Sequence, residues 1–391
     1  MLTTKLVCLG TAVCAAAAIV QAGSAQAGPS AGPVAYVYVT STPANSSVNE
    51  VQAYSAAPDG KLTPVPGSPF PEAVTSMAVN GLFLMGASQT TTDINAYHIE
   101  SNGSLTYAAS TNYAQYNNGC GAAGSVYFDH TGADLYIQEF DADCSNTGVA
   151  SFAVDKPTGG LNYLGVDITG VFPGDFTPAS FIGNNVYAYT GDNDSCMYYT
   201  TYGFQRNSNG LLTNIAANYN LPAPPPTFTR YIPALSAADP TNHVAFVMFP
   251  GMPPGCTSDP LQLANYTADA SGNLNTTNTY ANMPTTRIVS PFDMKMAPSG
   301  KILALAGQEG LQVFHLHGAN PITRYTGLLT TNPINQMFWD NNNHLYAISQ
   351  SAGKLHVFTI TPLGYFEAPG SPYTISSPDN IIVQPWPLPW A

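Results

Sequence analysis

The stretch YVYVTSTPANSSVNEVQAYSAAPDGKLTPVPGSPF, from Tyr36 to Phe70, sets a pattern that the rest of the chain repeats. A β-forming run, Tyr36 to Thr40, leads through a polar loop into a second run, Val51 to Tyr54, and the turn Pro58-Asp59-Gly60 then opens a third run. Alternating β-formers bounded by Gly, Asn, Asp and Pro are typical of antiparallel hairpins. One such unit is too small to bury a core, so several must pack together.

The most legible landmark of the repeat is an aromatic residue followed by a tight turn and an apolar residue. It occurs seven times, as Tyr54…Leu62, Tyr97…Leu105, Phe152…Leu161, Phe204…Leu211, Tyr266…Leu274, Phe314…Ile322 and Phe358…Tyr365. The turns from Gly60 to Gly364 are 304 residues apart over six intervals. The period is therefore about 51 residues, which is typical of propeller blades and longer than most helical repeats.

Each hairpin is preceded by a short apolar strand, a turn and a second strand, as in Met294-Lys295-Met296 before Ser299-Gly300. Each repeat therefore predicts four strands. The first repeat lacks its innermost strand, whereas the last is followed by a spare one, Asn380 to Val383. We predict an all-β fold, a seven-bladed β-propeller with four-stranded antiparallel blades. The C-terminal strand would complete the first blade and close the ring, leaving no open sheet edge.

The beginning of the chain has the order of a secretory signal peptide: Lys5, an apolar run from Leu6 to Val20, and Ala25-Gln26-Ala27. Residues 1–27 are predicted to be cleaved, and residues 28–391 to form a single propeller domain. No other segment approaches 18 consecutive apolar residues, so no membrane insertion is expected. We expect an exported protein, either periplasmic or secreted to the cell surface.

The charge balance is strongly acidic. The full chain has a formal net charge of −13, and removal of Lys5 with the signal would make it −14. Such a surface repels phosphate backbones and anionic lipid, so the composition disfavours nucleic acid and membrane surfaces as partners.

Four cysteines would remain after cleavage: Cys120, Cys144, Cys196 and Cys256. An even number in an exported chain favours disulfides. The repeat places all four in loops on one face, which favours the pairs Cys120–Cys144 and Cys196–Cys256. A metal site built from four thiolates is the alternative, although no CxxC spacing is present.

Several segments resemble the lactonase-type seven-bladed propellers, the group that includes bacterial 6-phosphogluconolactonase and the YVTN-repeat surface proteins. They are VYVTS at 37–41, VQAYS at 51–55, DGKLTPVPGSPF at 59–70, its echo EAPGSPY at 367–373, and the strand-turn-strand stretch from Phe152 to Leu161. The resemblance covers nearly the whole mature chain and implies the propeller fold. It says less about activity, because propellers host many functions on one scaffold.

The resemblance also implies where catalytic residues would fall. Family enzymes are thought to use a histidine, arginines and a glutamate around the channel mouth. The chain has Gly124 near the position of the first histidine, Arg230-Tyr231 in place of an Arg-His pair, and Phe249 near the position of the glutamate. One of the three positions, Arg230, matches.

Arg230 and Arg287 are the most suggestive candidate site residues. Each precedes an innermost strand, ten residues before Pro240 and eleven before Pro298, so neighbouring blades are expected to present both at one channel mouth. Two cations there suit a carboxylate or the developing oxyanion of an opening lactone. Structural guanidinium groups bonded to loop carbonyls are the alternative interpretation. Lys295 joins the two arginines as a candidate ligand-binding residue.

Acidic and imidazole side chains supply further candidates. Glu139 and Asp143 lie where a strand runs into the loop of Cys144, so Glu139 is a candidate general base and Asp143 a candidate ligand-binding residue, with solvated loop acids as the alternative. His315 and His317 alternate along one strand, but a third metal ligand is not evident. The sequence therefore predicts no metal site and no cofactor.

The first functional hypothesis is an exported lactonase-like propeller that binds a small molecule, glycan or protein through its loop-rich face and channel mouth, as a monomer. The alternative is a lactone hydrolase acting on an extracytoplasmic lactone, with Arg230 and Arg287 polarising the carbonyl and Glu139 activating water. A structural role in the cell envelope is the third possibility. Whether the protein is an enzyme stays open at this point.

Overall fold

The structure is a computed structural model that describes residues 32–116, 124–141, 147–170, 178–191, 201–215, 219–252, 255–256 and 261–386. Residues Pro33–Ala391 form one compact unit, distinct from Met1–Gly32. Within the described residues, no helix is long and apolar enough to cross a membrane.

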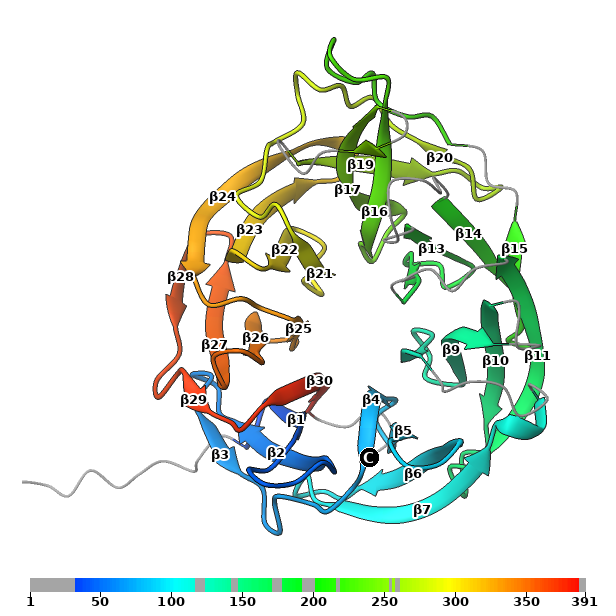
Figure 1. The fold of residues 1–391 in the computed structure, drawn as a ribbon, viewed down its shortest axis with the longest axis vertical. Helices are drawn as coiled ribbons and strands as arrows, with labels where there is room; N and C mark the ends of the chain where they lie inside the picture. The colour runs from blue at the N-terminus through cyan, green and yellow to red at the C-terminus, as the bar shows by residue number, and fades with distance from the viewer. Residues whose placement is uncertain are drawn as a thin grey trace, which may run out of the picture. The chain divides into compact units, whose positions relative to one another are not determined.

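Seven antiparallel sheets stand around a common axis in this unit, with one strand of each sheet nearest the centre (Figure 1). From the innermost strand outward, blade 1 contains β30 (Pro378–Pro385), β1 (Ala35–Ser41), β2 (Glu50–Ala56) and β3 (Leu62–Pro64). Blade 2 contains β4 (Val74–Val79), β5 (Phe83–Ser88), β6 (Asp93–Ile99) and β7 (Leu105–Asn112). Blade 3 contains β8 (Val126–Phe128), β9 (Asp134–Asp141), β10 (Thr147–Val154) and β11 (Leu161–Gly170).

The second half of the ring has the same plan. Blade 4 contains β12 (Ser180–Phe181), β13 (Tyr187–Gly191), β14 (Thr201–Arg206) and β15 (Leu212–Ile215). Blade 5 contains β16 (Arg230–Ala238), β17 (His243–Met252), β19 (Gln262–Ala268) and β20 (Leu274–Asn275), with the short β18 (Gly255–Cys256) on β17. Blade 6 contains β21 (Pro291–Met296), β22 (Ile302–Gly307), β23 (Gly310–His317) and β24 (Asn320–Thr330). Blade 7 contains β25 (Gln336–Trp339), β26 (His344–Ser349), β27 (Lys354–Thr361) and β28 (Gly364–Glu367), with β29 (Tyr373–Thr374) on β27. A 3₁₀ turn, η1 (Ala114–Tyr116), follows β7.

The ring closes as the sequence predicts. The C-terminal strand β30 pairs antiparallel with β1, with Ile381 opposite Val39 and Ile382 opposite Tyr38. In Figure 1 the red β30 lies beside the blue β1, on the side of the central axis. This pairing supplies the innermost strand that the first repeat lacks and confirms the seven-bladed propeller.

Core residues lie between neighbouring blades rather than in one central core. Seven buried clusters among the described residues fill the seven blade-to-blade interfaces. Because successive side chains of a strand point to opposite faces, β1 serves two of them. Val37 and Val39 pack toward blade 7, whereas Tyr36 and Tyr38 pack toward blade 2. The alternation of β-formers in the opening stretch is thus explained by burial on both faces.

A tyrosine of one blade bonds to a turn glycine of the next at three interfaces. The hydroxyl of Tyr189 on β13 donates to the carbonyl of Gly272 at 2.8 Å, and both residues are buried. The same bond joins Tyr38 to Gly103 and Tyr136 to Gly210. These glycines occupy the turn between the two outer strands of their blades. The recurring turn in the sequence is therefore also a contact between blades.

Two constraints at Gly272 require glycine. Its φ of +81° lies in the left-handed region that side chains with a Cβ rarely adopt. A methyl group there would lie 2.7 Å from Cε1 of Tyr187 in the neighbouring blade. The turn therefore approaches the neighbouring blade more closely than a residue with a side chain would allow.

Removal of one interlocking hydroxyl tests its contribution to stability. We expect Tyr189→Phe to lower the free energy of unfolding by about 1–3 kcal/mol, because it leaves a buried carbonyl without its donor. Chemical denaturation of the purified protein measures this loss. The matched control is Tyr107→Phe, since Tyr107 is 63% exposed and the same change there should have little effect. Equal stability of the two variants would contradict a structural role for the bond.

Candidate functional site

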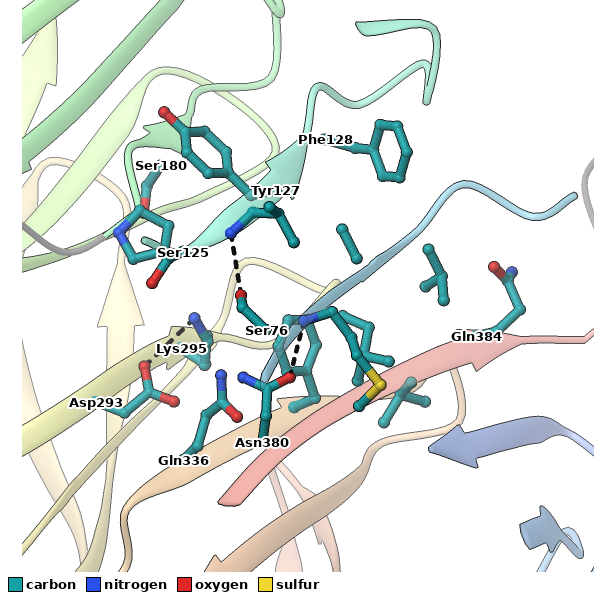
Figure 2. A pocket seen from close by; sticks show the side chains of 18 of the residues that line it. Ser76, Ser125, Tyr127, Phe128, Ser180, Asp293, Lys295, Gln336, Asn380 and Gln384 are labelled. Atoms are coloured by element: carbon teal, nitrogen blue, oxygen red, sulfur yellow. Dashed lines mark hydrogen bonds and ion pairs between the residues drawn. The ribbon is translucent and has the colours of Figure 1, made fainter. Parts of the chain in front are cut away.

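A cavity of about 980 Å³ occupies the centre of the ring. Residues of the innermost strands β30, β4, β8, β12, β16, β21 and β25 line it, together with the turns that follow β4 and β8. Figure 2 shows these strands converging on the cavity. Every blade contributes, so the composition of the innermost strands decides its chemistry.

One polar residue of each innermost strand lines the cavity at an equivalent position of the repeat, and we call this set the polar ring. Its members are Ser76, Ser125, Ser180, Ser236, Asp293, Gln336 and Asn380. The residue that follows each member is apolar and buried: Met77, Val126, Phe181, Ala237, Met294, Met337 and Ile381. Strand alternation accounts for this pattern, because one side chain faces the cavity and the next packs between blades.

Members of the polar ring bond to the backbone of the next blade's innermost strand. These strands have an unpaired edge toward the axis, where N–H groups need acceptors. The acceptors are Asn380 Oδ1 for the N–H of Met77 at 3.1 Å, Ser76 Oγ for Val126 at 3.0 Å, Asp293 Oδ2 for Met337 at 2.9 Å, and Gln336 Oε1 for Ile381 at 2.6 Å. The ring therefore bonds the innermost strands to one another.

These bonds use acceptors and leave donors. An amide whose oxygen accepts a backbone N–H still has its nitrogen, and a serine whose Oγ accepts still has its hydroxyl proton. Gln336 Nε2, Asn380 Nδ2 and the Ser76 hydroxyl donate to no partner within the described residues, and all three residues line the cavity. The wall of the channel is consequently rich in hydrogen-bond donors.

Lys295 adds a cation to the same wall. It lies two residues after Asp293 on β21, so both side chains point to one face. Its Nζ lies 3.3 Å from Oδ1 of Asp293 and 5.0 Å from the ring centroid of Phe338 on β25. With 27% of its side chain exposed, Lys295 is neither freely solvated nor sealed off. Figure 2 shows the pair at the edge of the cavity.

Tyr127 contributes a neutral hydroxyl to the channel. Its hydroxyl lies 3.2 Å from Oε1 of Gln138, and burial raises the pKa of Tyr127 well above its ordinary range. The side chain therefore keeps its proton at physiological pH. It offers a ring face and a polar group, not a base.

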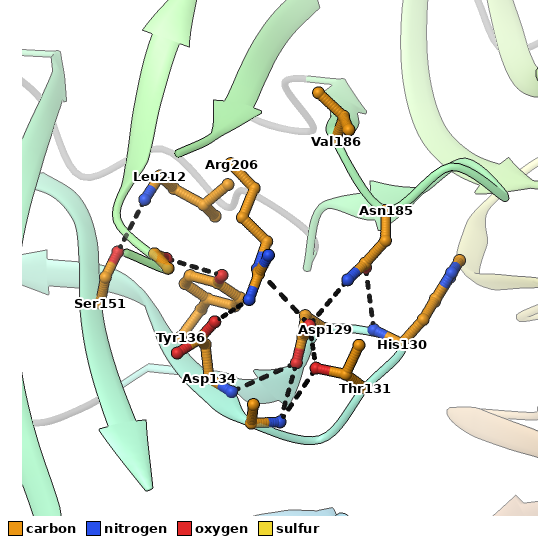
Figure 3. A network of polar contacts seen from close by, with 12 residues as sticks. Asp129, His130, Thr131, Asp134, Tyr136, Ser151, Asn185, Val186, Arg206 and Leu212 are labelled. Carbon is orange, nitrogen blue, oxygen red and sulfur yellow. Dashed lines mark hydrogen bonds and ion pairs between the residues drawn. The ribbon is translucent and has the colours of Figure 1, made fainter. Parts of the chain in front are cut away.

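A buried carboxylate lies where β8 ends, at the other end of the channel (Figure 3). Burial alone would raise the pKa of Asp129, but the bonds from Thr131 and Asn185 and the nearby Arg206 outweigh burial and lower it. Thr131 Oγ1 donates to Oδ2 at 2.6 Å, Asn185 Nδ2 donates at 2.7 Å, and Arg206 Nε lies 3.4 Å away. Asp129 therefore stays ionised.

The same arrangement recurs in other blades, which indicates its purpose. Oδ1 of Asp129 accepts backbone N–H groups from the turn that follows β8, and Asp239 and Asp340 do so after β16 and β25. A carboxylate in this position satisfies the backbone of a tight turn. We therefore assign Asp129 to the turn and not to ligand chemistry.

The structure does not bring the two predicted arginines together in the channel. Neither is among the described residues that line the cavity. Arg230 is the first residue of β16 and is half-buried. The backbone N–H of the exposed Arg287 donates to Gln312 Oε1 on β23 at 2.8 Å, and its Nη1 would lie 3.5 Å from a methyl group at Gly327 on the outer strand β24. Arg287 is thus directed along its own blade, away from the axis. The expected convergence at the channel mouth is absent, and the catalytic and binding roles stay predictions.

The other predicted residues fall in different places. Lys295 lines the channel. Glu139 lies on β9, but its side chain is outside the described part of the structure, as is Asp143. Cys120, Cys144 and Cys196 are outside the described residues, while Cys256 lies on β18. Both disulfide pairs and the signal peptide over residues 1–27 therefore stay predictions.

Sequence reasoning missed the polar ring, although a signal for it was present. The same order occurs before the turn in each repeat, a polar residue followed by an apolar one, as in Ser76-Met77, Asp293-Met294 and Asn380-Ile381. The members differ in type, which hides the pattern until the strands are aligned around the axis.

The ring's bond between blades 6 and 7 is testable with two substitutions at one position. Asp293→Ala should lower the free energy of unfolding by about 1–3 kcal/mol, because the Met337 N–H loses its acceptor and Lys295 loses its partner. Asp293→Asn keeps an acceptor oxygen and should retain most of the stability. Thermal and chemical denaturation of both variants would decide the matter, and equal loss in both would show that charge and not the backbone bond is what counts.

Comparison with known proteins agrees with this architecture. No protein-family model matches the chain, and a search of curated proteins also finds no match. Among solved structures, a proposed 6-phosphogluconolactonase from Bacteroides fragilis superposes with a TM-score of 0.65 at 12% identity, over 91% of this chain and 99% of that one. A proposed 6-phosphogluconolactonase from Bacteroides uniformis gives 0.63 at 12% identity, over 89% and 99%.

A third similar structure has a printed location as well as an activity. The periplasmic gluconolactonase of Pseudomonas aeruginosa superposes with a TM-score of 0.61 at 13% identity, over 90% of this chain and 99% of that one. At these identities the likeness establishes the fold and no more. The chain therefore shares the fold of the 6-phosphogluconolactonase-like seven-bladed β-propellers.

Proposed function

We propose that the protein is a binding propeller whose central channel takes a small, acceptor-rich, hydroxylated molecule. The observation that carries the proposal is the wall of donors formed by Gln336, Asn380, Ser76 and Lys295, whose acceptor partners are already in place within the protein. A ligand that fills this wall must itself supply oxygens. The cavity of about 980 Å³ falls in the size range of small-molecule sites.

The charge and the ring faces narrow the class of ligand. Lys295 is the cation within reach of the ligand among the described channel residues, and Asp293 balances part of its charge. The faces of Phe338 and Tyr127 offer apolar contact beside the donors. A polyhydroxy acid suits this combination, since its carboxylate reaches Lys295 and its hydroxyl oxygens accept from the amides.

Lactone hydrolysis is the second candidate. Similar structures are described as lactonases, and the Lys295–Asp293 pair places a cation and a carboxylate side by side in the channel. In a hydrolase of this kind the cation would polarise the lactone carbonyl while a carboxylate activates water. The proposal ranks second because the arginine pair expected for this chemistry does not converge in the channel.

Three further elements of the proposal rest on the sequence alone. We propose that the protein is exported to the periplasm or the cell surface, that it acts as a monomer, and that no resident cofactor takes part. The signal-like order of residues 1–27 supports export. A structural role in the envelope is the remaining alternative.

Calorimetric titration with a sugar acid tests the binding role. We expect D-gluconate to bind the mature protein and Lys295→Met to weaken it about tenfold or more, because a charged hydrogen bond is lost. A neutral sugar should be much less affected by the same change. Lys61→Met on the exposed turn of blade 1 is the matched control and should leave affinity unchanged. Equal affinity for gluconate in all three proteins would overturn the assignment of Lys295.

A turnover screen on a panel of sugar lactones separates binding from hydrolysis. We expect no opening of the lactone ring above the uncatalysed rate, measured by proton release. Hydrolysis that Lys295→Met abolishes would replace the binding proposal with the lactonase. Hydrolysis that Arg230→Ala abolishes instead would restore the arginine predicted from the sequence.

A further inference from the structure

A second cavity, of about 680 Å³, lies away from the channel, among turns of blades 5, 6 and 7. The turn after β16 contributes Asp239 to Thr241, and β17 contributes its first residue, His243. The turn before β22 and the end of β23 contribute Lys301, His315 and His317. Figure 1 places β17 and β23 in adjacent blades. Three imidazoles and a lysine thus share one cavity that the channel does not include.

Two of the imidazoles are oriented by bonds that leave one nitrogen over. Nδ1 of His243 lies 2.9 Å from Oδ2 of Asp239, and its Nε2 is directed toward Gly318, where a methyl group would lie 3.7 Å away. Nε2 of His317 lies 2.8 Å from Oγ1 of Thr323, so Nδ1 is its other nitrogen. These contacts fix the rings without using all of their hydrogen-bonding capacity.

The third imidazole is held by stacking. The ring of His315 lies 4.1 Å from the ring of Tyr325, measured between centroids, and Tyr325 meets Tyr365 of blade 7 edge to face at 5.7 Å. His315 and His317 are 6.1 Å apart by the same measure. Both nitrogens of His315 donate to and accept from no partner within the described residues, so the ring is available to a ligand.

This geometry does not form a metal site. No three His, Cys, Asp or Glu side chains in the described part of the chain gather closely enough to hold an ion. The charge of the cavity points instead to an anion. Asp239 is already bonded to Thr241 and His243 and is only 6% exposed, whereas Lys301 is exposed and has no acidic partner among the described residues. Apolar walls from Pro240, Leu316 and Pro362 strengthen the field of these groups.

We propose that this cavity binds a small oxyanion, a phosphate or carboxylate group, through Lys301, His243, His315 and His317. The imidazoles donate when protonated, and Lys301 donates at any physiological pH. The site is independent of the channel and of the function proposed for it. In a chain with a net charge of −13 and ten Lys and Arg residues, the cavity collects cationic groups at one place.

Binding to this site strengthens as the pH falls. Each imidazole that gains a proton adds a positive charge and a donor, while the exposed Lys301 is charged throughout. Burial and the neighbouring His317 lower the pKa of His315, so this ring gains its proton at a lower pH than an ordinary histidine. Asp239 stays ionised over the same range, because its bonds to Thr241 and His243 outweigh burial and lower its pKa. The groups that face the imidazoles, Tyr325 and Thr323, do not change charge there.

Calorimetric titration of the mature protein with inorganic phosphate and with citrate, at about pH 8 and about pH 5.5, tests the proposal. We expect affinity about tenfold or more higher at the lower pH. Lys301→Met should weaken binding at both pH values, and the double variant His315→Gln with His317→Gln should remove most of the pH dependence. Lys61→Met controls for the loss of a surface charge. Circular dichroism of each variant confirms that the fold is intact.

Three results would overturn the proposal. They are affinity that does not change with pH, binding that survives Lys301→Met unchanged, and phosphate binding that Lys295→Met in the channel abolishes. Response to only one of the two probes would show whether the site takes phosphate or carboxylate groups. Because the last variant lies in the other cavity, failure of this proposal is distinguishable from failure of the channel proposal.

Discussion

The pairing of β30 with β1 is the interaction on which the rest of the structure depends. A strand with an open edge exposes unpaired N–H and C=O groups, so a row of hairpin repeats is stable only when its two ends meet. Here the last strand of the chain becomes the innermost strand of the first blade, with Ile381 and Ile382 opposite Val39 and Tyr38. The buried side chains of β30 then complete the two cores on either side of blade 1.

Closure sets the distance between blades, and two kinds of polar contact make use of it. Away from the axis, the tyrosines of Tyr38, Tyr136 and Tyr189 reach the carbonyls of turn glycines in the next blade. Along the axis, the polar ring supplies acceptors to strand edges that have no further strand to pair with. The second contact also determines the channel's chemistry, because the acceptors are occupied by the backbone and the donors remain. The binding proposal follows from this asymmetry.

The two cavities differ in how they obtain their polar groups. Channel groups come from the faces of innermost strands, one from each blade, and are fixed by bonds between strands. Groups of the second cavity come from turns and from the end of β23, and are fixed by a carboxylate, a threonine and a tyrosine ring. The channel has one cation whose charge is stable with pH, whereas the second cavity has three groups that titrate near neutrality.

Much of the fold was predictable because its signals are local. A turn glycine such as Gly272 needs a positive φ, and the turn before β26 places Asn343 at a φ of 65°, so both announce themselves in a short stretch of sequence. The strand alternation of Tyr36 to Val39 likewise reflects burial on both faces. Even the closure between distant ends was predictable, since one repeat lacks a strand and another has a spare.

The candidate site was much less predictable, because it depends on which strand faces the axis and at what height. Ser76, Gln336 and Asn380 are different residue types far apart in the chain, and only the ring brings them to one level. Arg230 and Arg287 have matching distances to their turns, yet the bond from the Arg287 backbone to Gln312 directs that residue along its own blade. By itself the sequence determined the number of blades and their closure, through turns and strand periodicity. Only the tertiary structure decided which side chains share a cavity, because that depends on packing between blades.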